Sequence, residues 1–332
     1  NVHTLQAEHM YNAFKKAGQN AKLILHQDGH NFIFGKMIGD DLFEELMNRW
    51  RCHYLYDEDN GIEDMPELSV QSNVDGKYAF FDTIPDTTTL IPDTDASGDE
   101  PEIFSSDLDR FYEKYVHDTR VVDRYYLEQD DMYAKVYDLE TGSDEPFTFI
   151  GSPEIHVKLK TPDISKQDLM VTAVLLDTQK DNGIFKAYIT GNDLSGCLPE
   201  KTIECFEYGP GHAPGTITEY IPSPTDVKAI SYGWTNLLTP DRGKHASEYT
   251  EKTDIEADEY YTYNIYLQPT VYTVNPGHSL KLAILAQDPQ RVLMDEDASD
   301  VTPYFVDGYQ DPGYSFTLDE DSLEVRLNVI GD

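Results

Sequence analysis

The second half of the chain is a series of short, β-prone runs separated by turn-forming residues. From about residue 130 the runs are rich in β-branched and aromatic residues, and clusters of glycine, proline, asparagine and aspartate divide them. Short strands joined by such turns are typical of β-sandwiches and jelly rolls. The sequence therefore predicts a mostly β protein, with strands at residues 146–161, 168–178, 183–190, 215–221, 226–234, 260–274, 279–287 and 322–330.

The first 56 residues follow an α/β pattern instead. Two segments have apolar residues at helical spacing, and a short apolar run and a polar loop lie between them. Gly18 suits the position after the first helix, and Asp40 or Asp41 suits the N-cap of the second. This unit is too small to bury both faces of a parallel sheet alone. The expected order is helix, strand, loop and helix, at residues 5–17, 22–26, 27–39 and 40–55.

The segment between these two parts has mixed character. Alternating runs at residues 67–72 and 76–81 predict a strand pair with an Asp-Gly turn. Residues 82–102 are rich in proline, aspartate and threonine, and we expect a long surface loop there. A short helix is expected at residues 105–116.

The charge balance excludes several classes of partner. Asp and Glu number 62 against 25 Lys and Arg, and the formal net charge is −37. Such a chain is not expected to bind nucleic acid or an anionic membrane surface. Solubility is the ordinary consequence of this charge, and a preference for cationic ligands is the alternative.

Cysteine usage and the absence of processing motifs favour a cytoplasmic location. Three scattered cysteines, Cys52, Cys197 and Cys205, form neither a disulfide framework nor a zinc pattern. No Asn-x-Ser/Thr acceptor occurs, and no apolar run is long enough to span a bilayer.

Two histidines lie four residues apart where the first strand ends. His26 closes the strand and is expected to pack, whereas His30 lies in the polar loop between strand and helix. In α/β-hydrolases the triad histidine occupies a loop near the end of the sheet, where imidazole can act as a general base. His30 is therefore the candidate catalytic residue, and an ordinary exposed loop histidine is the alternative.

The sequence shows neither a complete metal-binding motif nor a nucleophile motif. The two histidines have the spacing of a helical zinc motif, but Gln27 replaces the required glutamate and Gly29 disfavours a helix. The acidic loop at 93–102 resembles a calcium loop, but Phe104 stands where a bidentate glutamate is needed. No G-x-S-x-G or glycine-rich phosphate loop occurs. We expect no cofactor and find no nucleophile in this chain.

Several stretches together carry a family resemblance. The stretches are "NVHTLQAEHMYNAF", "KLILHQDGH", "LMNRWRCHYLYDEDNGIEDMPELSVQSN", "FIGSPEIHVKLKT" with "LMVTAVLLD", and "YNIYLQPTVYTVNPGHSLKLAILAQDP". Through them the chain resembles, over essentially its whole length, the C-terminal part of Xaa-Pro dipeptidyl-peptidases of lactic acid bacteria, serine peptidases whose family also includes cocaine-esterase-like hydrolases.

The resemblance implies a role for His30 as the triad histidine, with His26 as its nearest rival. Asn1-Val2 resembles the tail of the loop that holds the catalytic acid, so the acid and the serine are expected upstream of residue 1. The intact enzyme is expected to release Xaa-Pro dipeptides from peptide N-termini and to form homodimers. This chain alone is expected to be inactive.

The resemblance also implies a domain organisation. Residues 1–66 would be the last α/β segment of an α/β-hydrolase domain, 67–146 a connecting segment, and 147–332 a jelly-roll, galactose-binding-like β-sandwich. Residues 275–284 would form a hairpin near the far end. Tyr232 and Trp234 would line a contact with the hydrolase or a sugar, or would be half-exposed core aromatics.

Two other functions stay open at this point. One is an acyl esterase or amidase resembling cocaine esterase. The other is a non-catalytic β-sandwich module that binds a carbohydrate or a partner protein.

Overall fold

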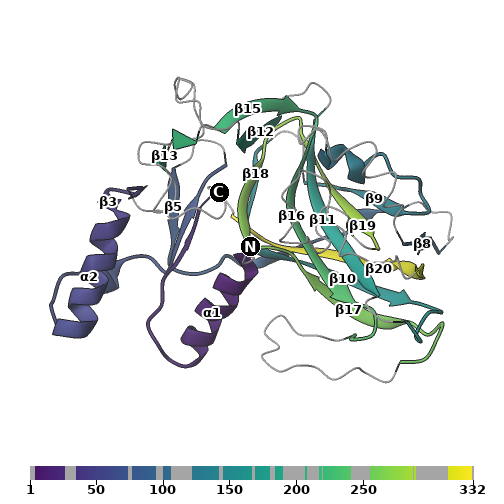
Figure 1. Cartoon of the computed structure of the whole chain (residues 1–332), viewed down its shortest axis with the longest axis horizontal. Coiled ribbons are helices and arrows are strands. Elements are labelled where there is room, and N and C mark those ends of the chain that lie inside the picture. The colour runs from purple at the N-terminus through teal and green to yellow at the C-terminus, as the bar shows by residue number, and fades with distance from the viewer. Residues whose placement is uncertain are drawn as a thin grey trace.

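The computed structural model confirms a mostly β protein (Figure 1). Within the described residues there are two α-helices, α1 (Thr4–Lys16) and α2 (Phe43–Tyr56), and both lie near the N-terminus, as the helical spacing predicted. The structure describes residues 4–26, 35–73, 77–94, 100–105, 122–141, 145–166, 169–179, 184–189, 206–207, 217–218, 220–240, 255–286, 288 and 313–330.

Two antiparallel sheets form most of the described structure. Sheet I has the order β17-β10-β20-β6, and β18 also pairs with β10 and β8 with β20; sheet II has the order β16-β11-β19-β9-β7. The strands of sheet I are β17 (Tyr261–Tyr266), β10 (Phe147–Lys160), β20 (Ser315–Val329), β6 (Thr87–Leu90), β18 (Thr270–Val274) and β8 (Glu102–Phe104). The strands of sheet II are β16 (Val227–Asn236), β11 (Met170–Thr178), β19 (Ser279–Leu285), β9 (Ala134–Leu139) and β7 (Pro92–Asp93).

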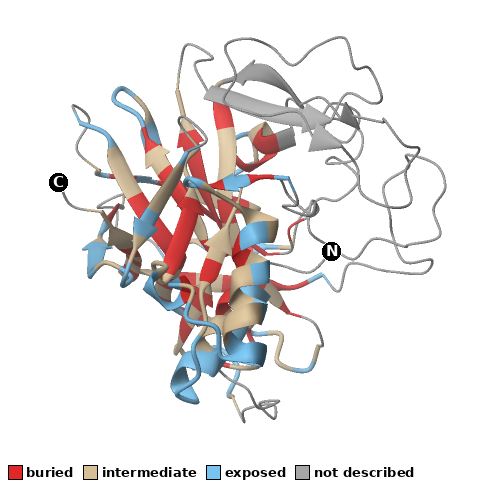
Figure 2. Cartoon of the chain, turned by 90° about the vertical axis from the view of Figure 1, so that its left-hand side faces the viewer, coloured by how far each residue is buried: buried red, intermediate tan, exposed pale blue. Residues whose placement is uncertain are grey.

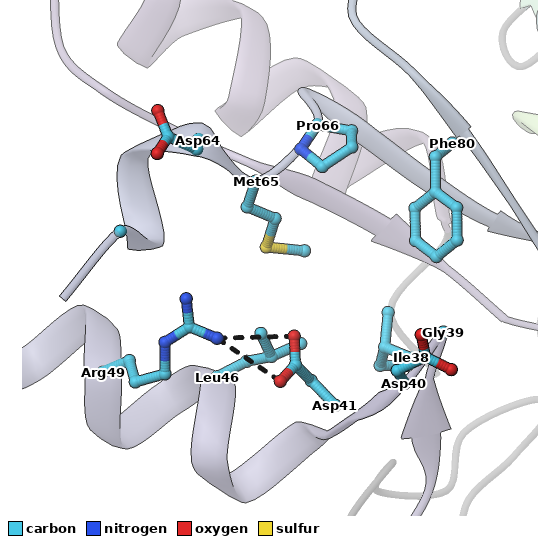
Figure 3. A pocket seen from close by; sticks show the side chains of 11 residues that line it. Ile38, Gly39, Asp40, Asp41, Leu46, Arg49, Asp64, Met65, Pro66 and Phe80 are labelled. Carbon is cyan, nitrogen blue, oxygen red and sulfur yellow. Dashed lines mark hydrogen bonds and ion pairs between the residues drawn. The ribbon is translucent and has the colours of Figure 1, made fainter.

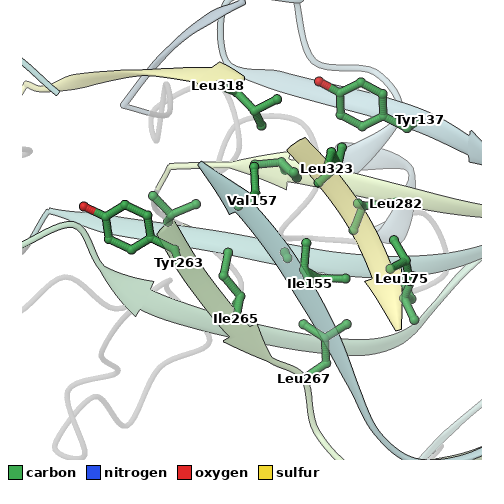
Figure 4. Packing of buried hydrophobic residues seen from close by; sticks show 14 of the residues in the cluster. Tyr137, Ile155, Val157, Leu175, Tyr263, Ile265, Leu267, Leu282, Leu318 and Leu323 are labelled. Atoms are coloured by element: carbon green, nitrogen blue, oxygen red, sulfur yellow. The ribbon is translucent and has the colours of Figure 1, made fainter. Parts of the chain in front are cut away.

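The two sheets pack on one apolar core, and we call this part of the molecule the sandwich (Figures 2 and 4). Along β10, Ile155, Val157 and Leu159 are fully buried, while His156 and Lys158 between them face outward. This alternation follows from the two-residue period of a strand with one wet face. Central strand β11 is buried on both faces, because the 3-10 helix η2 (Val122–Tyr126) covers the outer side of sheet II with Tyr125 and Tyr126.

A smaller sheet joins the N-terminal segment to the sandwich. β1 (Leu23–Leu25) pairs in parallel with β4 (Leu68–Gln71), and β4 pairs antiparallel with β5 (Tyr78–Phe81). One face of this sheet packs against Tyr11 of α1 and against Ile150, Val271 and Ile330 of the sandwich. The other face packs against α2 and the 3-10 helix η1 (Ile62–Asp64). The strand pair expected at 67–81 is thereby confirmed.

Two local expectations were wrong, and a third is not tested by the described residues. Residues 82–102 are not one loop, because β6 and β7 within them pair with β20 and β9 at the sheet edges. The segment at 275–284 is not a hairpin, since β18 belongs to sheet I and β19 to sheet II, so residues 275–278 cross between the sheets. The expected helix at 105–116 falls largely outside the described residues.

The N-cap prediction for α2 was also wrong. The N-cap residue is Leu42, which makes no side-chain capping bond. Asp41 lies in β3 (Asp41–Leu42), which pairs with β2 (Met37–Ile38), and its carboxylate accepts hydrogen bonds from Arg49. The hairpin runs straight into the helix, and this places both aspartates before the capping position. Short strand pairs also join β12 (Ile184–Ile189) to β15 (Tyr220–Thr225) and β13 (Phe206–Glu207) to β14 (Ile217–Thr218).

A buried hydrogen-bond cluster links the two sheets. Tyr272 of β18 donates to Asp177 of β11 at 2.7 Å, and His278 Nδ1 lies 2.9 Å from the same carboxylate. Burial and the Asp177 carboxylate together raise the pKa of Tyr272 well above its usual value. The tyrosine hydroxyl therefore stays protonated and serves as a donor to a carboxylate that is only 1% exposed.

We expect Tyr272→Phe to lower the free energy of unfolding by about 1.5–3 kcal/mol, because a buried carboxylate loses a donor. Tyr263→Phe is the matched control: it removes an equally buried hydroxyl whose acceptor is the neutral Leu237 carbonyl, and should cost about 1 kcal/mol. Urea denaturation measures both, and equal losses would contradict a special role for Asp177.

At Gly233 the backbones of the two sheets approach so closely that only a glycine fits. A Cβ built on Gly233 of β16 would lie 2.2 Å from the Tyr266 carbonyl oxygen of sheet I. The obstacle is backbone, so no side-chain rotation can relieve the contact.

Gly233→Ala should therefore destabilise the protein by at least about 3 kcal/mol. Gly277→Ala provides the control, since its Cβ meets nothing within 4 Å and costs only the left-handed backbone strain at φ +81, about 1–2 kcal/mol. Thermal unfolding of the two variants tests this, and a G233A protein as stable as G277A would refute the close approach.

Candidate functional site

The segment that contains His30 is anchored by described structure on both sides. β1 ends at Leu25, and half-buried His26 follows it directly. The description resumes at Gly35, whose N–H donates to Glu44 of α2 at 2.7 Å. His30 itself lies outside the described residues. The strand at 22–26 and the helix at 40–55 are confirmed, whereas β2 lies within the loop expected at 27–39.

Glu67 is the centre of the contacts that hold this frame together. Its carboxylate accepts from Tyr11 at 3.0 Å and Lys15 at 2.9 Å, both on α1, and from Lys22 at 3.4 Å, just before β1. Its carbonyl accepts from Leu23 N–H at 2.9 Å. One residue therefore joins α1, β1 and the start of β4.

The charges around Glu67 shift two pKa values in opposite directions. Partial burial raises the pKa of Glu67, but the hydrogen bonds from Lys15 and Tyr11 and the charge of Lys22 outweigh it, so the net shift is downward. Burial and the same carboxylate raise the pKa of Tyr11 to about 12. At neutral pH Glu67 is therefore a carboxylate and Tyr11 a neutral phenol.

A pocket of about 550 Å³ opens on the α2 side of the small sheet (Figure 3). Met65, Pro66 and Phe80 face Leu46 and Arg49 across it. The Arg49 guanidinium is held by the Asp41 carboxylate at 3.3 Å and by the Asn60 carbonyl at 3.1 Å. The remaining lining residues are Ile38, Gly39, Asp40, Gly61 and Asp64.

The other residues singled out from the sequence are spread over the molecule. Tyr232 and Trp234 stack on the outer face of sheet II, with ring centroids 6.2 Å apart and an interplanar angle of 11°, and Trp234 is 37% exposed. Cys52 is a free thiol, while Cys197 and Cys205 lie outside the described residues. Within the described part of the chain, no three His, Cys, Asp or Glu side chains are grouped to hold a metal ion.

Sequence reasoning missed the Glu67 cluster. Its members lie on three elements whose order in space depends on the β1–β4 pairing, and no local motif marks them. The one available signal was Glu67 at the start of an alternating run, where a charged residue is ordinarily solvated.

Replacing Glu67 by Gln should reduce stability in a pH-dependent way. Because the pKa of Glu67 is lowered in the folded protein, its contribution is complete above the unfolded value of about 4.3 and is lost as the pH falls through the folded value. We expect a deficit of about 1 kcal/mol at pH 7 that shrinks below about pH 4.5.

Urea denaturation from pH 7 to pH 3.5 measures this deficit. Exposed Glu58→Gln removes the same charge from this very acidic chain without breaking a described side-chain contact, so it corrects for general relief of repulsion. A deficit that grows on acidification would contradict the assigned shift.

Comparison with known proteins identifies the family of the chain. The description "X-Pro dipeptidyl-peptidase C-terminal non-catalytic domain" matches residues 60–302. The Xaa-Pro dipeptidyl-peptidase of Pediococcus pentosaceus is 24% identical over 351 residues, which cover 98% of this chain and 39% of the relative. That of Lacticaseibacillus paracasei is 27% identical over 301 residues, covering 87% and 35%. The chain thus spans less than half the length of these relatives.

A solved structure supports the same fold. An alpha-amino acid ester hydrolase aligns with a TM-score of 0.52 at 14% identity, covering 98% of this chain and 53% of the other. In the described part of the chain, no helix has the length and apolarity needed to cross a bilayer. The resemblance found in the sequence is confirmed: the chain belongs to the family of X-Pro dipeptidyl-peptidase C-terminal non-catalytic domains.

Proposed function

We propose that this chain is the C-terminal part of a serine exopeptidase that releases Xaa-Pro dipeptides from peptide N-termini. The observation that carries the proposal is the match of 98% of the chain to a protein named Xaa-Pro dipeptidyl-peptidase, of which it covers 39%. In this proposal the serine and the acid lie in the part of the enzyme upstream of residue 1. The chain alone is then inactive.

His30 is the proposed triad histidine. It lies outside residues 60–302, the range matched by the non-catalytic family description, and in the segment of sequence between β1 and the β2–β3 hairpin that leads into α2. In the reaction it takes the proton of the serine hydroxyl during acylation and returns a proton to the leaving amine. The acidic character of the chain suits substrates with a cationic N-terminus.

The proposed organisation keeps the division at residues 1–66, 67–146 and 147–332, with a jelly-roll, galactose-binding-like last part. The connecting segment supplies β6 to β9, which complete the sheets of the sandwich. The upstream part of the enzyme is the proposed partner of the helices, since α1 and α2 expose large apolar side chains: Met10, Phe14, Tyr54, Leu55 and Tyr56. Homodimer formation and a cytoplasmic location stay predictions.

A non-catalytic binding module is the second candidate. The family description itself calls the domain non-catalytic, and the exposed Trp234 stacked on Tyr232 offers an aromatic surface for a sugar ring or a partner protein. The two proposals are compatible, because a sandwich can bind a ligand inside a larger enzyme.

The test is an assay of residues 1–332 preceded by their natural upstream sequence, on Ala-Pro-para-nitroanilide and on an aryl ester. We expect rapid cleavage of the anilide, and His30→Ala should lower kcat at least about 1,000-fold. His26→Ala is the matched control and should keep most of the activity.

Other outcomes would redirect the assignment. Cleavage of the ester alone would favour an acyl esterase. An active H30A protein together with an inactive H26A protein would move the triad role to His26. No cleavage at all, with specific glycan binding, would favour the binding module.

A further inference from the structure

Helix α1 is docked to the sandwich by a buried carboxylate. Of its thirteen residues only Glu8 is buried, at 2% exposure, and its carboxylate accepts a hydrogen bond from the Ser152 hydroxyl of β10. A carboxylate in such a place is costly unless donors satisfy it. The apolar side chains Met10 and Phe14 of the same helix are largely exposed. The position of α1 on the sandwich therefore depends on a polar contact of defined direction.

Strand β10 is shaped for this contact. Its pairing with β20 shifts register between Ile150 and Glu154, and Gly151 adopts the left-handed conformation at φ +86. A bulge of this kind re-aims the side chains beside it. The interruption lies where Ser152 meets Glu8, and pairing resumes at Glu154, before a second register shift between His156 and Lys158.

A second contact holds the start of the helix. The Leu5 N–H donates to the Gln268 side-chain oxygen at 2.9 Å. First-turn N–H groups have no acceptor within a helix, and α1 has no acidic residue in its first turn. The sandwich thus supplies the capping acceptor, from the connection between β17 and β18.

Hydrogen bonds to its backbone hold Gln268 in place. Its N–H donates to the Tyr232 carbonyl at 2.9 Å, and its carbonyl accepts from the Ser231 hydroxyl at 2.6 Å. Next to these residues, Gly233 lets β16 approach the Tyr266 carbonyl. The capping oxygen is therefore presented beside the close approach of the two sheets at Gly233.

We propose that Ser152 and Gln268 are positioning residues for the catalytic centre, acting through Glu8 and α1. This inference rests on the proposed function, in which the acid lies just before residue 1 and His30 follows β1. Helix α1 joins these two segments; the sandwich holds its first half and Glu67 holds Tyr11 and Lys15 in its second half. The sandwich thereby sets the distance between acid and histidine without touching substrate.

The first experiment needs no catalytic activity. Hydrogen exchange of the 332-residue chain is compared for wild type, Ser152→Ala, Gln268→Leu and the double variant. We expect exchange over Thr4–Lys16 to accelerate at least about tenfold in the double variant, with Phe43–Tyr56 unchanged. Thr161→Val is the control: it removes a buried hydrogen bond to the Ser315 carbonyl beyond the far end of β10, so it should lower Tm without changing α1.

The second experiment uses the full-length enzyme. Ser152→Ala and Gln268→Leu should lower kcat on Ala-Pro-para-nitroanilide about 10- to 100-fold with little change in KM, because a displaced acid or histidine harms the chemical step and leaves substrate binding intact. Ser152→Thr keeps the hydroxyl and should retain activity. Thr161→Val should have wild-type kcat.

The outcomes separate this inference from the function on which it rests. Unchanged α1 exchange in the double variant overturns the docking role of Ser152 and Gln268, whatever the enzyme cleaves. A loosened α1 with wild-type kcat overturns the positioning role. Failure of the wild-type full-length protein to cleave the anilide overturns the proposed function and, with it, the catalytic part of the inference.

Discussion

The packing of sheet I against sheet II is the interaction on which the rest of the molecule depends. β10 and β20 are long strands that pair along most of their length. Their inward side chains pack against those of β11 and β19 in one apolar core. Burial of this apolar surface is the main favourable term in folding such a domain. The Tyr272–Asp177–His278 cluster helps to fix the alignment of the two sheets, because its bonds form only when the two sheets are in register.

The small sheet of β1, β4 and β5 depends on this sandwich for its stability. Three strands with one short parallel pair would be marginal alone. Ile150 and Val271 cover Leu23, Leu68 and Val70, so the core of the small sheet is completed by strands of sheet I. The polar contacts of α1 act at the same boundary. The strand and the helix that flank the segment with His30 are therefore attached to a support that is mostly β.

The elements that flank the candidate site were predicted from the sequence, and the role of His30 stays a prediction. The strand at 22–26 and the flanking helices follow from local periodicity, and the family resemblance singled out His30. The Glu67 cluster and the docking of Glu8 on Ser152 were not readable. Glu8 lies in a helix whose other residues are exposed or half-buried, where a glutamate ordinarily faces water, and its partner is far away in sequence. Such contacts form only when distant parts of the chain pack together, and the sequence around one residue does not indicate its partner.

The sequence by itself determined the class of fold and the position of most elements, because strand alternation and helical spacing are local properties of the chain. Only the tertiary structure decided which strands became neighbours. It made edge strands of residues 87–93, where composition predicted a loop, and it made residues 275–278 cross between sheets where a hairpin was expected. Edge pairing and sheet crossing are set by long-range hydrogen bonds and shared core burial, and these have no counterpart in a short window of sequence.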